Sequence, residues 1–139
     1  MTTKAPAMPP APPRQRVLLI EDELPLIDVV KGKLEAEQFE VVVARSVEQA
    51  LASLTSDGQI DAIWLDHFLL GRQTGLDFIT DLKKPGSRWR ATPIFLVTNT
   101  AGSETDAEYL RLGVEKVYSK AAARLDTIVA DIKARLKPH

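Results

Sequence analysis

From Val17 onward, short apolar runs alternate with stretches in which apolar residues recur at helical spacing. Runs that are apolar throughout are typical of strands buried on both faces of a sheet. Five such runs predict strands, at residues 17–20, 41–43, 60–65, 93–97 and 114–118. The first run ends abruptly in an acidic stretch, as a buried strand does when it reaches the rim of its sheet.

The segments between these runs have helical periodicity or helix-capping signals. Ser46 to Gln49 forms a capping box, and a loop containing Gly71 and Gly75 precedes a helix with Leu76, Ile79 and Leu82 on one stripe. The other predicted helices span residues 24–37, 103–112 and 124–136, and the capping box opens a helix that runs to residue 54. Five strand–helix units predict an α/β fold, a doubly wound parallel sheet with helices on both faces.

The first residues have a different composition. Residues 1–13 hold five of the nine prolines, interleaved with alanine and threonine, and lack large apolar side chains other than methionine. Such a segment cannot contribute to a core. We therefore expect a disordered, proline-rich leader over residues 1–15 and one domain over residues 16–139.

Composition excludes several classes of function. The 139 residues are 45% hydrophobic and 27% charged with net charge −1, which gives no electrostatic support for binding to nucleic acid or a membrane surface. The absence of cysteine excludes disulfides, cysteine-ligated metals and thiol catalysis. No apolar run approaches the roughly 18 residues of a membrane span. We expect a cytoplasmic protein with no direct nucleic-acid or membrane partner.

Polar residues follow four of the five predicted strands. Glu21 and Asp22 follow the first strand, Asp66 the third, Thr98 the fourth and Lys120 the fifth. Ligands of open parallel sheets bind beyond the carboxyl ends of the strands. These side chains should therefore converge on one rim of the sheet.

Three crowded carboxylates need compensation, because each pair about 4 Å apart costs about 4 kcal/mol at an effective dielectric of about 20. Either protons are taken up or a divalent cation binds among them, and an all-oxygen set suits Mg²⁺. A lysine and a threonine beside that site can bind phosphoryl oxygens, and a carboxylate can act as the nucleophile. The rim is thus suited to phosphoryl transfer.

With these features the sequence resembles the receiver domain of two-component response regulators over residues 16–137. The matching motifs are the acidic residues after the first strand, Asp66 after Ala62-Ile63-Trp64-Leu65, Gly75-Leu76-Asp77-Phe78-Ile79, Pro93 to Thr98, and Lys120. The resemblance implies a flavodoxin-like sheet in the order 2-1-3-4-5. It also implies that the chain is a phosphoacceptor in a phosphorelay and not an enzyme beyond self-catalysed phosphoryl transfer and slow autodephosphorylation.

The resemblance also implies roles for individual residues. Asp66 is the expected phosphoacceptor, with Glu21, Asp22, Asp66 and the Phe68 backbone carbonyl as ligands of Mg²⁺. Lys120 and Thr98 are expected to bind the phosphoryl group. The implied donor is a sensor histidine kinase or a histidine phosphotransfer protein. Because no output domain follows, we expect a stand-alone receiver that signals through contact with a downstream protein.

Four positions depart from the family pattern, all near the expected switch. Asn99 replaces a small residue and either crowds Asp66 or hydrogen-bonds its phosphoryl group. Val117 occupies the usual position of the switch aromatic, and Tyr118 comes one residue later, which turns its ring to the opposite face of the sheet. Ala121 replaces a proline. We expect phosphorylation to survive and its transmission to be atypical.

Two other functions fit the sequence. The departures at Asn99, Val117 and Ala121 also suit a receiver-like interaction module that binds its partner without phosphorylation. A small phosphohydrolase with an aspartyl intermediate is less favoured, because position 68 is phenylalanine and offers no general acid.

Overall fold

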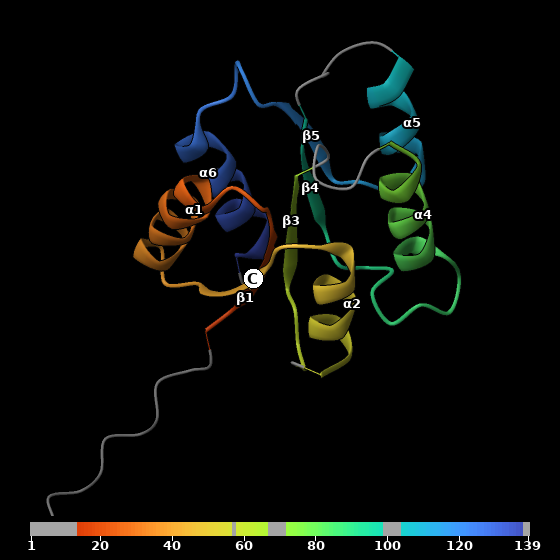
Figure 1. The fold of residues 1–139 in the computed structure, drawn as a ribbon, viewed down its shortest axis with the longest axis horizontal. Coiled ribbons are helices and arrows are strands. Elements are labelled where there is room, and N and C mark those ends of the chain that lie inside the picture. The colour runs from red at the N-terminus through yellow and green to blue at the C-terminus, as the bar shows by residue number, and fades with distance from the viewer. Residues whose placement is uncertain (1–13, 57, 67–71, 99–103, 138–139) are drawn as a thin grey trace, which may run out of the picture.

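The computed structural model describes residues 14–56, 58–66, 72–98 and 104–137. Five parallel strands form one sheet in the order β2-β1-β3-β4-β5, which confirms the predicted topology (Figure 1). The strands are β1 (Arg16–Ile20), β2 (Glu40–Ala44), β3 (Ala62–Asp66), β4 (Ile94–Thr98) and β5 (Lys116–Ser119). Residues 1–13 of the leader predicted over residues 1–15 lie outside the described residues. Gln15, which the prediction placed in that leader, belongs to the domain, because its side chain donates to the Leu136 carbonyl at 2.8 Å.

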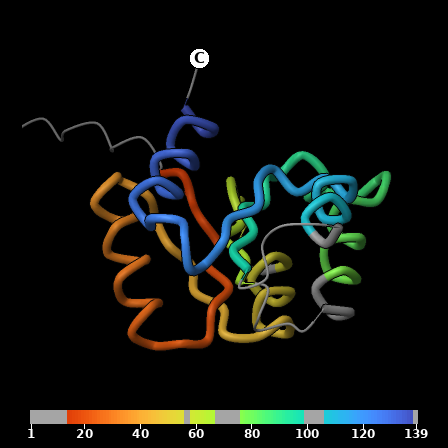
Figure 2. Tube along the Cα trace, turned by 90° about the horizontal axis from the view of Figure 1, so that it is seen from above, coloured from red at the N-terminus to blue at the C-terminus, as the bar shows by residue number. Residues whose placement is uncertain are grey.

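Helices cover both faces of the sheet, as predicted. They are α1 (Leu24–Ala36), α2 (Val47–Ser56), α4 (Arg72–Lys83), α5 (Glu104–Leu112) and α6 (Leu125–Leu136). Seen from above, α1 and α6 lie on one side of the sheet and α2, α4 and α5 on the other (Figure 2). Each side therefore has its own apolar core.

The strands supply both cores, because successive side chains of a strand point to opposite faces. Leu18 and Ile20 pack in the core under α2, α4 and α5, whereas Val17 and Leu19 pack in the core under α1 and α6. Every residue of β3 and β4 is buried. This continuous burial explains why these strands read as apolar runs and why their first polar residues mark the rim.

Several predicted boundaries were wrong by one residue or more, including the start of β3 at Ala62 instead of residue 60. Two of the differences have a clear physical cause. Helix α4 begins at Arg72, so Gly75 lies inside the helix and not in the preceding loop. One glycine costs a helix about 1 kcal/mol, which the buried side chains of Phe78 and Ile79 offset. Strand β5 begins at Lys116 instead of residue 114, because Val114 lies in the turn that closes α5.

The end of α5 is a Schellman motif centred on Gly113. Gly113 has φ 107°, its N–H donates to the Leu110 carbonyl at 3.1 Å, and the Val114 N–H donates to the Tyr109 carbonyl at 3.2 Å. This is the bonding pattern of a helix that closes on a left-handed residue. The backbone donor of Val114 is thus used by the helix and is not available to a strand.

Candidate functional site

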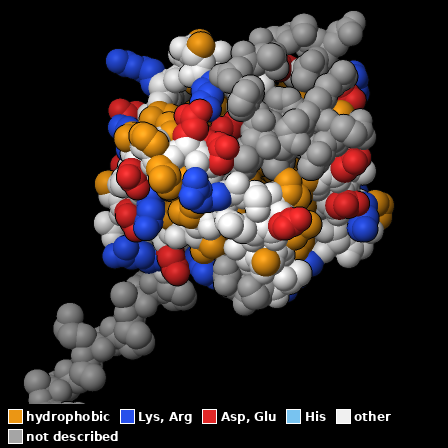
Figure 3. All heavy atoms as spheres, viewed as in Figure 1, with side chains coloured by type: hydrophobic (Ala, Val, Ile, Leu, Met, Phe, Trp, Pro, Cys, Tyr) orange, Lys and Arg blue, Asp and Glu red, His pale blue; other side chains and the backbone are white. Residues whose placement is uncertain are grey.

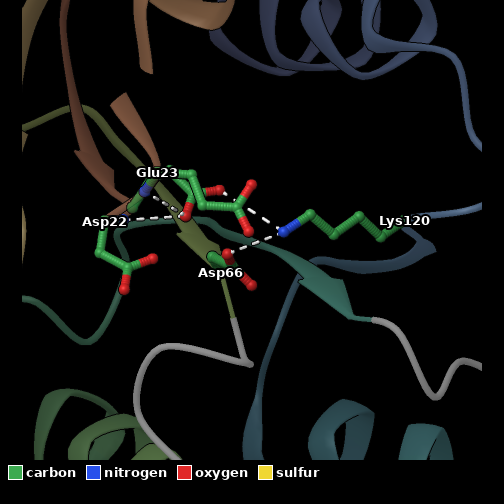
Figure 4. A network of polar contacts seen from close by, with 5 residues as sticks. Asp22, Glu23, Asp66 and Lys120 are labelled. Atoms are coloured by element: carbon green, nitrogen blue, oxygen red, sulfur yellow. Dashed lines mark hydrogen bonds and ion pairs between the residues drawn. The ribbon is translucent and has the colours of Figure 1, made fainter. Parts of the chain in front are cut away.

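The carboxyl ends of four strands bring the predicted site residues to one rim. Glu21 and Asp22 follow β1, Asp66 and Thr98 are the last residues of β3 and β4, and Lys120 follows β5. Figure 4 shows Asp22, Asp66 and Lys120 around one small volume, with the Lys120 ammonium directed at the acidic group. The convergence expected from parallel strand ends is therefore present.

The acidic side chains form a compact set of oxygen ligands. One carboxylate oxygen from each of Glu21, Asp22 and Asp66 lies within 4.8 Å of the others. Glu21 is 1% exposed and Asp66 is 2% exposed, whereas Asp22 is exposed to solvent. Three carboxylates without histidine or cysteine match the preference of Mg²⁺ for oxygen ligands. The residues present therefore fit a hard divalent cation.

Lys120 neutralises part of this negative charge. Its Nζ atom lies 3.2 Å from Asp66 Oδ2 and 3.7 Å from Glu21 Oε1. Burial acts to lower the pKa of Lys120, but the hydrogen bond and charge of Asp66, together with Glu21, raise the pKa overall. The backbone N–H of Lys120 donates to the Thr98 carbonyl at 2.8 Å, which fixes the lysine to the end of β4.

The surroundings of Glu21 favour its protonated form. Burial, followed by the hydrogen bond and negative charge of Asp66, raises its pKa from 4.5 to about 7, although backbone N–H groups of Asp22 and Glu23 act in the opposite direction. Those two N–H groups donate to Glu21 Oε2 at 2.9 and 3.4 Å. Proton uptake and cation binding, which the sequence left as alternatives, are thus available to the same residue in turn.

A groove of about 480 Å³ opens beside this rim between α1 and α6. Glu21 and Lys120 line one part of it, and apolar side chains such as Leu26, Trp64 and Leu125 line the rest. In the space-filling view, surface acidic groups lie beside apolar side chains on the α1 side of the molecule (Figure 3). The acidic site is therefore open to a partner of mixed polar and apolar surface.

The predicted switch positions are divided between the two faces of the sheet. Val117 packs against the core under α2, α4 and α5. Tyr118 is 6% exposed and packs in the opposite core. Ala121 is exposed, and the peptide bonds within the described residues are all trans. Thr98 is fully buried, while Phe68 and Asn99 lie outside the described residues.

Sequence reasoning missed Arg45, which directly follows β2. Its Nη2 atom donates to the Asp22 carbonyl at 3.1 Å. The rule of reading the residue after each strand would have found it, but an arginine has no chemistry in common with the acidic set and was passed over. The rim thus carries a contribution from all five strands.

Comparison with known proteins identifies the family. A family model described as the response regulator receiver domain matches residues 17–133. The chain belongs to this family. Among curated relatives, this receiver is 32% identical over 123 residues to the transcriptional regulatory protein CpxR of Klebsiella pneumoniae, covering 88% of the chain and 49% of the relative. It is 31% identical to the phosphate regulon regulator PhoB of Escherichia coli, covering 88% and 52%.

Solved structures show the same fold. The receiver superposes on HP1043, an orphan response regulator of H. pylori, with a TM-score of 0.76 and 23% identity, covering 90% of this chain and 100% of that one. For the chemotaxis protein CheY4 of Vibrio cholerae the TM-score is 0.74 and the identity 22%, with coverage of 89% and 100%. This receiver spans about half the length of the two curated relatives. Among its described helices, none combines the length and apolar character needed to cross a bilayer.

Proposed function

We propose that this receiver accepts a phosphoryl group on Asp66 from a phosphohistidine donor, in a reaction that requires Mg²⁺. The observation that carries the proposal is the grouping of three carboxylates within 4.8 Å around Asp66, with the Lys120 ammonium 3.2 Å from it. The same ammonium that offsets the carboxylate charge can also pair with phosphoryl oxygens.

The chain's own residues supply the chemistry of transfer. An Asp66 carboxylate oxygen forms the new P–O bond while the P–N bond of the donor breaks, and the bonding electrons leave on the imidazole nitrogen. Lys120 balances the charge that accumulates on the phosphoryl oxygens. Glu21, Asp22 and Asp66 would hold Mg²⁺, together with the predicted Phe68 carbonyl, and Mg²⁺ would neutralise and orient the phosphoryl oxygens.

Receivers of this family interact with kinases or phosphotransfer proteins, and we infer a donor of that kind here. The groove between α1 and α6 offers apolar surface next to Glu21 and Lys120, so a donor helix that carries its histidine to the rim can dock there. On the output side, Thr98 would respond to the phosphoryl group, and the signal would pass to a downstream protein by contact. Beyond self-catalysed transfer and slow autodephosphorylation, we propose no enzymatic activity.

The proposal is tested by incubating the protein with Mg²⁺ and acetyl phosphate and measuring its intact mass. We expect one hydroxylamine-labile phosphoryl group on the wild type and on Asp28→Asn, which changes an exposed aspartate of α1. Asp66→Asn should gain none. An unmodified wild type, or equal labelling of Asp66→Asn, would contradict the assignment.

A second function is favoured by the position of Tyr118, whose ring packs away from the face that holds Val117. A receiver without an aromatic on that face is also suited to binding its partner independently of phosphorylation. Once a partner is identified, equal affinity for the wild type and Asp66→Asn would favour this module over the phosphorylated switch.

A further inference from the structure

Arg45 connects the acidic rim to the second strand and to helix α2. Its guanidinium Nη2 donates to the Asp22 carbonyl at 3.1 Å. Its own backbone N–H donates to Gln49 Oε1 at 2.7 Å, and the Gln49 N–H donates to Ser46 Oγ at 3.1 Å. The capping residues at the start of α2 therefore hold the backbone from which the arginine reaches Asp22.

These contacts hold the Asp22 backbone on both sides. The Asp22 N–H donates to Glu21 Oε2 at 2.9 Å, and its carbonyl accepts from Arg45. Asp22 is exposed, whereas Glu21 and Asp66 are fixed by burial in the sheet. Burial therefore does little to hold Asp22, and these two hydrogen bonds fix the backbone from which its carboxylate extends.

We propose that Arg45 is a positioning residue of the Mg²⁺ site, which holds Asp22 so that its carboxylate faces Glu21 and Asp66. The proposal rests on the proposed function, because it presumes that these three carboxylates bind the cation. Groups that orient a metal ligand without touching the metal commonly raise its affinity. Arg45 would do so through the backbone of the ligand.

A positional role and a purely electrostatic role predict opposite effects. A guanidinium near a doubly charged cation repels it, so removing the charge alone would tighten Mg²⁺ binding. Loss of the hydrogen bond to Asp22 would instead free the carboxylate and weaken binding. The sign of the change in affinity therefore separates the two roles.

The experiment compares Mg²⁺ affinity of the full chain and its variants by isothermal titration calorimetry. Arg45→Met keeps the apolar stem and removes the donor. We expect its Kd for Mg²⁺ to rise about fivefold, the effect of losing one ordinary hydrogen bond. Arg88→Met is the matched control, because Arg88 is exposed and its Nη2 also donates to a backbone carbonyl, that of Gly58 before β3, at 3.4 Å. It should leave Kd unchanged.

Two further measurements distinguish failure of the positioning role from failure of the metal site. At saturating Mg²⁺, Arg45→Met should regain the wild-type rate of labelling by acetyl phosphate, and its metal-free melting temperature should stay near that of Arg88→Met. An unchanged or lower Kd, or a rate that stays low at saturating Mg²⁺, would overturn the positioning role. A wild type that binds no Mg²⁺ would instead refute the metal site of the proposed function.

Discussion

The Tyr118 hydroxyl donates a hydrogen bond to Asp131 Oδ2 on α6 at 2.8 Å. The same oxygen accepts from Lys116 Nζ at 2.9 Å, and that ammonium lies 5.3 Å from the centre of the tyrosine ring. Tyr118 is therefore tied to α6, on the face opposite to Val117. An aromatic held in this way cannot turn toward the α5 side without breaking a charge-assisted hydrogen bond.

Tyr118→Phe should lower the free energy of unfolding by about 1.5 kcal/mol at pH 7, the usual value of a hydrogen bond to a charged group. The hydrogen bonds from Lys116 and Tyr118 lower the pKa of Asp131 below its ordinary value of 3.8. Their stabilisation is therefore complete above that value and is lost as the pH falls through the lower folded-state pKa. Urea denaturation at pH 7 and in acid should show the difference between wild type and Tyr118→Phe shrinking at low pH.

Lys116→Met is the variant to compare with Tyr118→Phe, because it removes the other hydrogen-bond donor to Asp131 and leaves Tyr118 in place. Because the proposed transfer to Asp66 would not involve Tyr118, labelling of Tyr118→Phe by acetyl phosphate should equal that of the wild type. Slower labelling of this variant would mean that the ring is coupled to the phosphoacceptor after all.

The raised pKa of Glu21 predicts an unusual dependence of stability on pH. An acid whose pKa is higher in the folded state keeps its proton on folding, so the metal-free protein should lose stability as the pH rises from 4.5 to about 7. The full effect of such a shift is about 3 kcal/mol. Glu21→Gln should remove this loss and be more stable than the wild type at pH 8 in a chelating buffer.

The control for this comparison is Glu35→Gln, which changes an exposed glutamate of α1. It should follow the wild-type curve. Addition of Mg²⁺ at pH 8 should stabilise the wild type, because a ligand that binds only the folded state favours it, and should stabilise Glu21→Gln less. Parallel pH profiles for wild type and Glu21→Gln would show that Glu21 ionises normally.

The fold could be predicted from the sequence because both signals that indicate it, the apolar strands and the amphipathic helices, are local. Fully apolar strands and amphipathic helices alternate without interruption, and parallel sheets leave few topologies for such a chain. The site followed from the same logic, since Glu21, Asp22, Asp66 and Lys120 each stand at a strand end. Their placement agrees with prediction, while their chemical roles remain predictions.

The sequence could not predict contacts between residues that do not belong to one motif. Asp131 lies 13 residues after Tyr118, on a helix face that periodicity marks only as polar. Arg45 meets a backbone carbonyl, which is present at every residue and so leaves no trace in the sequence. The start of α4 was misplaced for another reason, because a glycine signals a boundary only when packing does not offset its cost.

The end of α1 offers a test of backbone strain. Gln38 has φ 71°, and the N–H groups of Gln38 and Phe39 donate to the carbonyls of Glu35 and Leu34. This is the same Schellman motif that Gly113 closes at the end of α5, but with a side chain at the left-handed position. Gln38→Gly should raise the free energy of unfolding by about 1 kcal/mol, as measured by urea denaturation.

The opposite change, Gly113→Ala, should destabilise the protein by about 1 kcal/mol, because it places a Cβ atom at a left-handed position. Gly32→Ala is the control, because this glycine has ordinary helical geometry and nothing lies within 4 Å of an added Cβ. If Gln38→Gly were no more stable than the wild type, contacts of the glutamine side chain would have to offset the strain of its backbone.

Lys120 should oppose Mg²⁺ binding while promoting transfer. Its ammonium lies within 3.7 Å of two of the three predicted carboxylate ligands, so the cation would bind against a fixed positive charge. Lys120→Met should therefore bind Mg²⁺ about tenfold more tightly, measured by calorimetry at pH 8.5, which is above the pKa of about 7 for Glu21 in the wild type. Labelling by acetyl phosphate should nevertheless fall, because no ammonium remains to balance the phosphoryl charge.

The control is Lys133→Met, which removes a lysine that pairs with Glu37 at 2.7 Å and does not contact the acidic rim. This variant should change neither the Mg²⁺ affinity nor the labelling. Weaker Mg²⁺ binding by Lys120→Met would show that the lysine holds the carboxylates in place for the metal instead of competing with it.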